Sequence, residues 1–203
     1  MYDDYLGFDE RYFNRGAVAD GYVLGYYEYP PRRPIDYSAF ASQVANVTGQ
    51  SKVLVVGCAT GISLRWMRVN QDIDRSFGMD ISEWAIDNAL SDVRDQVYLG
   101  DARDQDRYEE IARDAQGPPR WDGIYTEFLL SHFTDSEAIN VCDICHEEAT
   151  DVVVHRIWSG TGRQRDRDHF NIKTVSEWIS LTGYDESDNV FWIDYDRPED
   201  STI

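Results

Sequence analysis

Short apolar runs alternate with amphipathic segments along most of the chain, and this alternation limits the available folds more than any other feature. The runs are rich in β-branched residues, as in Lys52–Val56, which is typical of strands buried on both faces. We expect strands over residues 52–56, 76–79, 97–99, 121–125, 151–157 and 190–195. We expect helices over residues 36–49, 63–69, 82–90, 108–115, 135–148 and 174–181. The pattern predicts an α/β, Rossmann-like, doubly wound and mostly parallel sheet of six to seven strands, with helices on both faces.

Residues 1–36 differ in composition from the rest of the chain. They are dense in aromatic side chains and end in Pro30-Pro31-Arg-Arg-Pro34, which interrupts regular structure. We expect them to form an aromatic-rich N-terminal segment that could act as a lid, or else an aromatic cover on the sheet edge. Residues 37–203 are expected to form one cofactor-binding domain, because a chain of 203 residues favours a single core.

The chain is strongly acidic. Asp and Glu total 38 against 19 Lys and Arg, which gives a net charge of −19, and only Lys52 and Lys173 are lysines. Such a charge repels nucleic acid and anionic membranes. We interpret the composition as halophilic, because concentrated salt screens the self-repulsion of an acidic surface; an ordinary acidic protein is the alternative.

No apolar run is long enough to predict a membrane span. The first residues also lack the basic and apolar pattern of a secretory signal, so we expect a cytoplasmic protein.

Candidate site residues follow the expected strands. Gly57 and Gly61 come after the first strand, Asp80 ends the second, and Asp101 ends the third. Ligands of doubly wound sheets bind at the carboxyl ends of the strands. Glycines let the backbone approach a ligand closely, and the helix that follows attracts an anionic group. Asp80 could accept hydrogen bonds from ribose hydroxyls, and Asp101 could accept one from an adenine amino group while Ala102 donates its N–H.

At these residues the chain resembles the class I S-adenosylmethionine-dependent methyltransferases, of the type that acts on small molecules. The resemblance covers about residues 50–157. Four stretches resemble the motifs of that family, namely Val53–Gly61, Gly78–Ala89, Leu99–Ala102 and Trp121–Phe133.

The resemblance implies S-adenosylmethionine as the cofactor. Gly57 and Gly61 would flank its methionine moiety, Asp80 would hold the ribose, and Asp101 with Ala102 would hold adenine. Tyr22 could cover the sulfonium with its aromatic face. The residues that we predict to bind the cofactor are Gly57, Cys58, Ala59, Gly61, Asp80, Ile81, Asp101, Ala102, Glu127 and Tyr22.

Two positions depart from the family pattern. Ala59 replaces the central glycine of the first motif, and Glu147-Glu-Ala-Thr150 replaces the usual Pro-Gly-Gly before the fifth strand. The last strand also stands alone where the family normally ends in an antiparallel hairpin. A nicotinamide cofactor would need glycines at 57, 59 and 62, and two of these positions hold Ala59 and Ile62.

Methyl transfer from a sulfonium requires alignment of the reactants, exclusion of water and removal of one proton. Glu127 and His132 follow the fourth strand, and we predict these two as catalytic residues. His132 would be the general base or would orient the acceptor, and Glu127 would position the cofactor's amino group or the substrate. A capping or packing role beside the helix at Asp135 is the alternative for His132. His155, which could face the acceptor or cap the sheet, and His169 are weaker candidates.

Cys142-Asp-Ile-Cys145-His146 matches a haem-attachment pattern and could begin a zinc site. It falls within an expected helix and has no second ligand pair at suitable spacing. We therefore interpret the two cysteines as packing residues and predict no metal site.

The loop after the fourth strand reads Thr126-Glu127-Phe128, without the Pro-Pro of nucleic acid amino-methyltransferases. The arginines of residues 160–168 alternate with aspartates and indicate a solvated loop. We therefore predict methyl transfer to a small-molecule, sugar or nucleotide-linked acceptor, with no nucleic acid or membrane partner. The alternative is a catalytically silent cofactor-binding or structural protein that keeps the fold.

Overall fold

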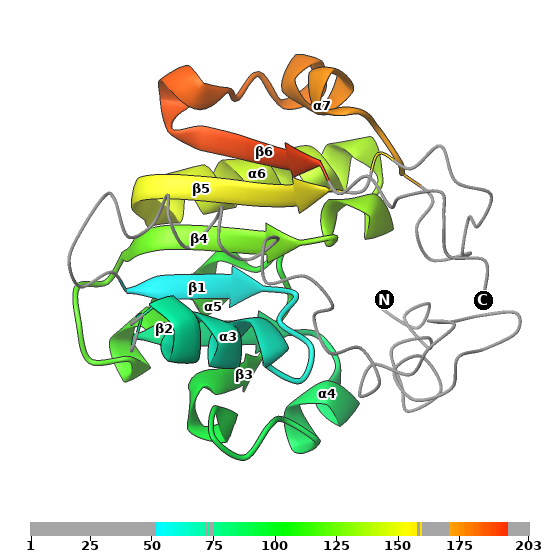
Figure 1. The fold of residues 1–203 in the computed structure, drawn as a ribbon. Helices are drawn as coiled ribbons and strands as arrows, with labels where there is room; N and C mark the ends of the chain where they lie inside the picture. Colours follow the sequence, from blue (N-terminus) through cyan, green and yellow to red (C-terminus); the bar gives the residue numbers. More distant parts are fainter. Residues whose placement is uncertain (1–51, 72, 74, 158, 160–170, 195–203) are drawn as a thin grey trace, which may run out of the picture.

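A computed structural model describes residues 52–71, 73, 75–157, 159 and 171–194 (Figure 1). The expected helix over 36–49, the aromatic N-terminal segment with Tyr22, and His169 lie outside the described residues.

The described residues form one six-stranded sheet in which every neighbouring pair of strands is parallel. The strand order is β3-β2-β1-β4-β5-β6, so the doubly wound sheet predicted from the sequence is confirmed. The order reverses beside β1, and the switch point therefore lies between β1 and β4. The strands are β1 (Val53–Val56), β2 (Ser76–Asp80), β3 (Val97–Leu99), β4 (Trp121–Glu127), β5 (Ala149–Ile157) and β6 (Val190–Asp194).

The last strand runs parallel to its neighbour. β6 pairs with β5 from Val153↔Val190 to Ile157↔Asp194, where a hairpin would have given an antiparallel pair. Helix α7 (Val175–Thr182) and the 3₁₀ turn η4 (Glu186–Asp188) return the chain to the amino end of the sheet before β6 begins. The crossover makes β6 parallel.

Helices cover both faces of the sheet, as predicted (Figure 1). Residues of α5 and α6 pack in one apolar cluster with β1, β2 and β4, and residues of α3 pack in a second cluster on the opposite face. Throughout the described ranges, each helix is too short or too polar to cross a bilayer. The remaining helices are α3 (Ile62–Gln71), α4 (Glu83–Asp87), α5 (Gln105–Asp114) and α6 (Asp135–Glu148), with 3₁₀ turns η2 (Arg94–Gln96) and η3 (Leu130–His132).

Helix α4 is shorter than the sequence predicts. It ends at Asp87, with Asn88 as its C-cap, whereas the expected helix extends to residue 90. The backbone N–H of Leu90 donates to the carbonyl of Thr60 over 3.0 Å instead of continuing the helix. A contact with the loop after β1 therefore replaces the last helical turn.

Candidate functional site

Three residues of the loop after β1 adopt left-handed backbone conformations and turn the chain sharply into α3. Gly57 and Gly61 have φ values of 78° and 84°, which glycine adopts without steric penalty. At Gly61 a Cβ atom would also lie 2.8 Å from Cγ2 of Val93, so a side chain would not fit. Ala59 has a φ of 48°, a conformation that costs an L-residue about 1–2 kcal/mol. Ala59 thus keeps a glycine-like conformation under strain.

The carboxylate of Asp80 ties this loop to the end of β2. The backbone N–H of Ala59 donates to Oδ2 over 2.8 Å, and that of Ser82 donates to Oδ1 over 2.9 Å. Burial raises the pKa of Asp80, and hydrogen bonds from the backbone of Ser82, Ala59 and Ile81 act in the opposite direction. Within the described part of the chain, the groups that bind this carboxylate are backbone N–H groups alone. A carboxylate has about four acceptor positions, so capacity remains for the hydroxyl groups of a ligand.

Asp80 and Asp101 lie at neighbouring strand ends. Asp80 pairs with Leu99 in the parallel register of β2 and β3, and the N–H of Gly100 donates to the carbonyl of Asp80 over 2.9 Å. The two residues therefore lie at the same edge of the sheet, whereas their role in binding a cofactor stays a prediction.

Arg103 holds the side chain of Asp101, a contact that the sequence analysis missed. Its Nε donates to Oδ1 over 2.9 Å and its Nη2 to Oδ2 over 2.6 Å, while its Nη1 donates to Oε1 of Glu137 over 2.7 Å. Burial acts to raise the pKa of Asp101, but the hydrogen bonds and charge of Arg103 outweigh it and lower that pKa. Asp101 is therefore ionised at neutral pH.

Two exposed apolar side chains flank these carboxylates. Ile81, which directly follows β2, is 38% exposed. Leu99, the last residue of β3, is 41% exposed. Such side chains suit a flat apolar ligand surface. Cys58 instead packs beneath the loop against Gly78, where a Cβ atom would lie 2.6 Å from its Sγ. Burial raises the pKa of the Cys58 thiol well above its usual value. Cys58 could therefore contact a ligand only through its backbone.

Glu127 ends β4 in a buried ion pair. Its Oε1 accepts a hydrogen bond from Nη1 of Arg156 over 2.7 Å, and its Oε2 accepts one from the hydroxyl of Ser63 at the start of α3. The side chains of Arg156 and Glu127 are only 5% and 10% exposed. Arg156 and Ser63 were not predicted. The signal for Arg156 was a charged residue near the end of a buried strand, after the apolar run Val152–Val154, whereas Ser63 gave none.

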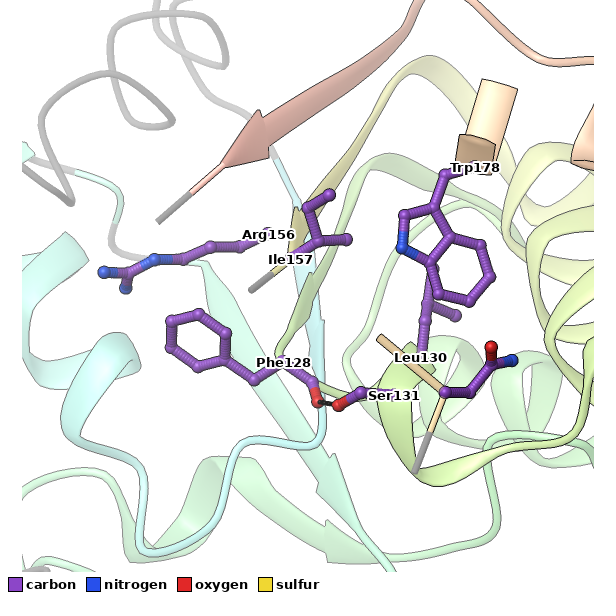
Figure 2. Close-up of a pocket in the computed structure, with 7 residues that line it drawn as sticks. Phe128, Leu130, Ser131, Arg156, Ile157 and Trp178 are labelled. Atoms are coloured by element: carbon purple, nitrogen blue, oxygen red, sulfur yellow. Dashed lines mark hydrogen bonds between the residues drawn. The ribbon is translucent and has the colours of Figure 1, made fainter. Parts of the chain in front are cut away.

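A small pocket lies beside this ion pair, at the carboxyl ends of β4 and β5 (Figure 2). The guanidinium carbon of Arg156 lies 4.7 Å from the ring centroid of Phe128, which has a left-handed φ of 54°. The hydroxyl of Ser131 donates to the carbonyl of Phe128 over 2.9 Å and holds this turn. The lining residues are Phe128, Leu130, Ser131, Arg156, Ile157, Asn171 and Trp178.

His132 is half-buried at the end of η3. It does not cap the next helix, because Thr134 is the N-cap of α6 and forms a reciprocal capping box with Glu137. The capping alternative for His132 is therefore wrong. Its catalytic role remains a prediction.

His155 is buried in β5, between Thr126 of β4 and Trp192 of β6. Its Nδ1 lies 2.8 Å from Oγ1 of Thr126, and its ring lies 4.7 Å from that of Trp192. Burial lowers the pKa of His155 to about 3, so the ring is neutral at ordinary pH. Whether His155 faces an acceptor stays a prediction.

The cysteines of α6 belong to the core. Cys142 and Cys145 are buried in the same apolar cluster, and Cys145 Sγ lies 4.0 Å from the hydroxyl of Tyr108. The ring of His146 lies against that of Tyr184, with 4.6 Å between their centroids. The interpretation of both cysteines as packing residues is confirmed.

No family model matches the sequence, and no curated protein matches it either. Solved structures do match. The methyltransferase domain of bacterial CtHen1-C is 16% identical, with a TM-score of 0.54, over 74% of this chain and 80% of that one. The sugar N-methyltransferase KedS8 from Streptoalloteichus sp. ATCC 53650 is 16% identical, with a TM-score of 0.51, over 73% of this chain.

A chain from the complex of the Haloferax volcanii Trm112 methyltransferase activator is also similar. It is 15% identical, with a TM-score of 0.53, over 72% of this chain and 66% of that one. The match with the sugar N-methyltransferase KedS8 covers only 58% of that protein, so this chain spans little more than half of its length. The likeness is one of fold. The chain has the Rossmann-like fold of the class I S-adenosylmethionine-dependent methyltransferases.

Proposed function

We propose that this protein is an S-adenosylmethionine-dependent methyltransferase that acts on a small-molecule, sugar or nucleotide-linked acceptor. One observation carries the proposal. The loop Gly57–Gly61, Asp80 and Asp101 meet at one edge of a doubly wound sheet, where backbone and side-chain hydrogen bonds join the loop to Asp80. Ligands of this fold bind at the same edge.

The side chains present fit the adenosyl part of the cofactor. Asp80 has acceptor capacity for ribose hydroxyls, and its position next to β3 lets Asp101 and the Ala102 N–H receive adenine in the same crevice. The exposed side chains of Ile81 and Leu99 supply apolar surface for the base. Nicotinamide and other dinucleotides lack support, because the loop does not carry the glycine spacing that brings a backbone against a pyrophosphate.

The methionine part would lie by the start of α3. The N–H groups of the first turn of a helix have no partner inside the helix and attract a carboxylate. Glu127 stands beside that turn, as its bond with Ser63 demonstrates, and can accept a bond from an ammonium group. When bound, the cofactor supplies a methyl group already activated by its sulfonium.

The acceptor side would lie toward the ends of β4 and β5. Phe128 and Arg156 lie at this edge of the sheet, and Glu127 neutralises the charge of Arg156 there. His132 lies in the 3₁₀ turn η3 that follows β4. From there it would orient an acceptor or remove its proton. The similarity to a sugar N-methyltransferase supports acceptors of this class.

Calorimetry with S-adenosylhomocysteine in molar salt tests cofactor binding. We expect a single binding site. The free energy of unfolding should rise by about 2.7 kcal/mol when the ligand is at 100 times its Kd. NAD⁺ serves as the control ligand and should give no heat. The exposed-site variant Asp92→Ala should bind like the wild type, whereas Asp80→Ala should bind at least about tenfold more weakly because a charge-assisted bond is lost. Absence of binding at millimolar S-adenosylhomocysteine would overturn the proposal.

Turnover is tested with the methyl-labelled cofactor and a panel of amino sugars, sugar nucleotides and small phenols or amines. Label should move to one class of acceptor. His132→Ala should then lose about 10²–10⁴-fold in rate if His132 is the general base. His146→Ala is the matched control, because His146 lies in the last turn of α6, near the amino end of β5, where its ring packs against Tyr184. An unchanged rate in His132→Ala would remove His132 from the mechanism.

A further inference from the structure

Arg103 is fixed between two carboxylates from different elements. It donates to Asp101, two residues earlier in the chain, and to Glu137 in the first turn of α6. Its guanidinium carbon also lies 5.6 Å from the ring centroid of Phe133. The side chain of Arg103 is 14% exposed. The guanidinium therefore holds the Asp101 carboxylate from a mostly buried position.

Asp101 has little acceptor capacity left. Its Oδ1 accepts the backbone N–H of Arg103 over 2.9 Å and the side-chain Nε–H over 2.9 Å. Among the described residues, its Oδ2 accepts a single hydrogen bond, from Nη2 of Arg103 over 2.6 Å. An ionised carboxylate has about four acceptor positions, two on each oxygen. One position therefore remains, and it is on Oδ2.

We propose that Arg103 is a positioning residue that fixes the Asp101 carboxylate and leaves Oδ2 to accept one N–H, so that the site selects a 6-amino purine over a 6-oxo purine. The inference rests on the proposed function, because it concerns the adenine of the same cofactor. A single remaining acceptor matches the one amino hydrogen that adenine can direct toward a neighbouring carboxylate. The carbonyl oxygen of a 6-oxo purine would face Oδ2 as a second acceptor and would be repelled.

Glu137 keeps Arg103 in place. The carboxylate of Glu137 accepts bonds from the backbone and hydroxyl of Thr134 in the capping box of α6, so its own position is fixed by the helix. Tyr108, on α5, donates its hydroxyl to the carbonyl of Ala102 over 2.9 Å and holds the chain between Asp101 and Arg103. Contacts from α5 and α6 thus help to fix the direction of one carboxylate. A lysine at position 103 could keep the charge but not the two parallel bonds.

The test compares two ligands that differ only at the purine 6 position, S-adenosylhomocysteine and S-inosylhomocysteine, by calorimetry. In Arg103→Ala we expect the Kd of the adenosyl ligand to rise about tenfold, the value of one charge-assisted hydrogen bond, while the Kd of the inosyl ligand changes less than about twofold. Arg103→Lys should give an intermediate preference. Arg113→Ala removes an exposed arginine of α5 and should leave both Kd values unchanged.

The outcomes separate the two proposals. If the wild type binds neither ligand, the proposed function fails. If the wild type binds the adenosyl ligand but Arg103→Ala weakens both ligands equally, Arg103 has only a structural role and the inference is overturned. Should Arg103→Ala not fold, Glu137→Gln frees the guanidinium while glutamine keeps the capping box. That variant must also lower the adenosyl preference, and an unchanged preference would overturn the inference.

Discussion

The backbone N–H of Ala59 donates to the carboxylate of Asp80 over 2.8 Å, so the loop after β1 and the acid at the end of β2 form one hydrogen-bonded unit. Ala59 is also the strained residue of that loop, with a φ of 48°. The bond with Asp80 therefore helps to hold a conformation that alanine disfavours. Changes at either residue should affect both stability and ligand binding.

Asp80→Ala should lower the free energy of unfolding by about 2 kcal/mol or more, because the N–H groups of Ala59 and Ser82 lose their acceptor. Asp80→Asn should cost less, since the amide oxygen can still accept one bond. Urea denaturation at constant salt measures both. The control is Asp92→Ala, which breaks an exposed pair with Arg65 and should cost under about 1 kcal/mol. Equal losses at positions 80 and 92 would contradict the role of Asp80.

Ala59→Gly should stabilise the protein by up to about 1 kcal/mol. Glycine relieves the left-handed strain, and the gain is reduced by the greater entropy of glycine in the unfolded chain. The matched control is Ala85→Gly in α4, which should destabilise by about 1 kcal/mol, because glycine is unfavourable inside a helix. A loss of stability in Ala59→Gly would mean that the conformation is not strained.

Replacing either Glu127 or Arg156 with a neutral residue should lower the free energy of unfolding by about 3–5 kcal/mol, because the charge of the remaining partner is then buried without compensation. The double variant Glu127→Gln with Arg156→Met should lose less than the sum of the two single losses. A double-mutant cycle by chemical denaturation gives the coupling. Additive losses would show that the pair is not coupled in solution.

His155 should make stability depend on acidic pH. Its folded pKa is about 3, below the ordinary value of 6.5, so the unfolded chain binds the extra proton between these values. Stability contributed by the neutral ring is therefore complete above pH 6.5 and is lost as the pH falls toward 3, at up to about 1.4 kcal/mol per pH unit. Carboxylates titrate in part of the same range. The measurement is therefore the difference in slope between the wild type and His155→Phe, and equal slopes would contradict burial of a neutral histidine.

Salt should stabilise the folded chain. With a net charge of −19, self-repulsion is strong at low salt, and the Debye length falls from about 10 Å at 0.1 M to about 3 Å at 1 M. We expect the melting temperature to rise steadily between 0.1 and 2 M KCl. Since concentrated salts also strengthen hydrophobic burial to differing degrees, KCl and NaCl are compared at equal ionic strength. A melting temperature that is independent of salt would contradict the halophilic interpretation.

The sequence could predict the sheet and the positions of its strand-end residues because both depend on local patterns. Short apolar runs indicate strands wherever they lie in the chain, and parallel strands necessarily end at the same edge. Gly57, Gly61 and Asp80 were found in this way, and the structure brings them together. The end of α4 was missed because Leu90 bonds to Thr60, far back in the chain.

Sequence by itself determined the α/β class, the doubly wound and mostly parallel sheet, and the glycines and aspartates at the ends of its strands. Only the tertiary structure decided which charges are paired and which titratable groups are buried. Arg103 binds the carboxylate of Glu137, 34 residues away, and Arg156 binds that of Glu127, 29 residues away. The ring of His155 packs against Trp192 from another strand. Periodicity is a property of neighbouring residues, whereas ion pairing and desolvation depend on residues that folding alone brings together.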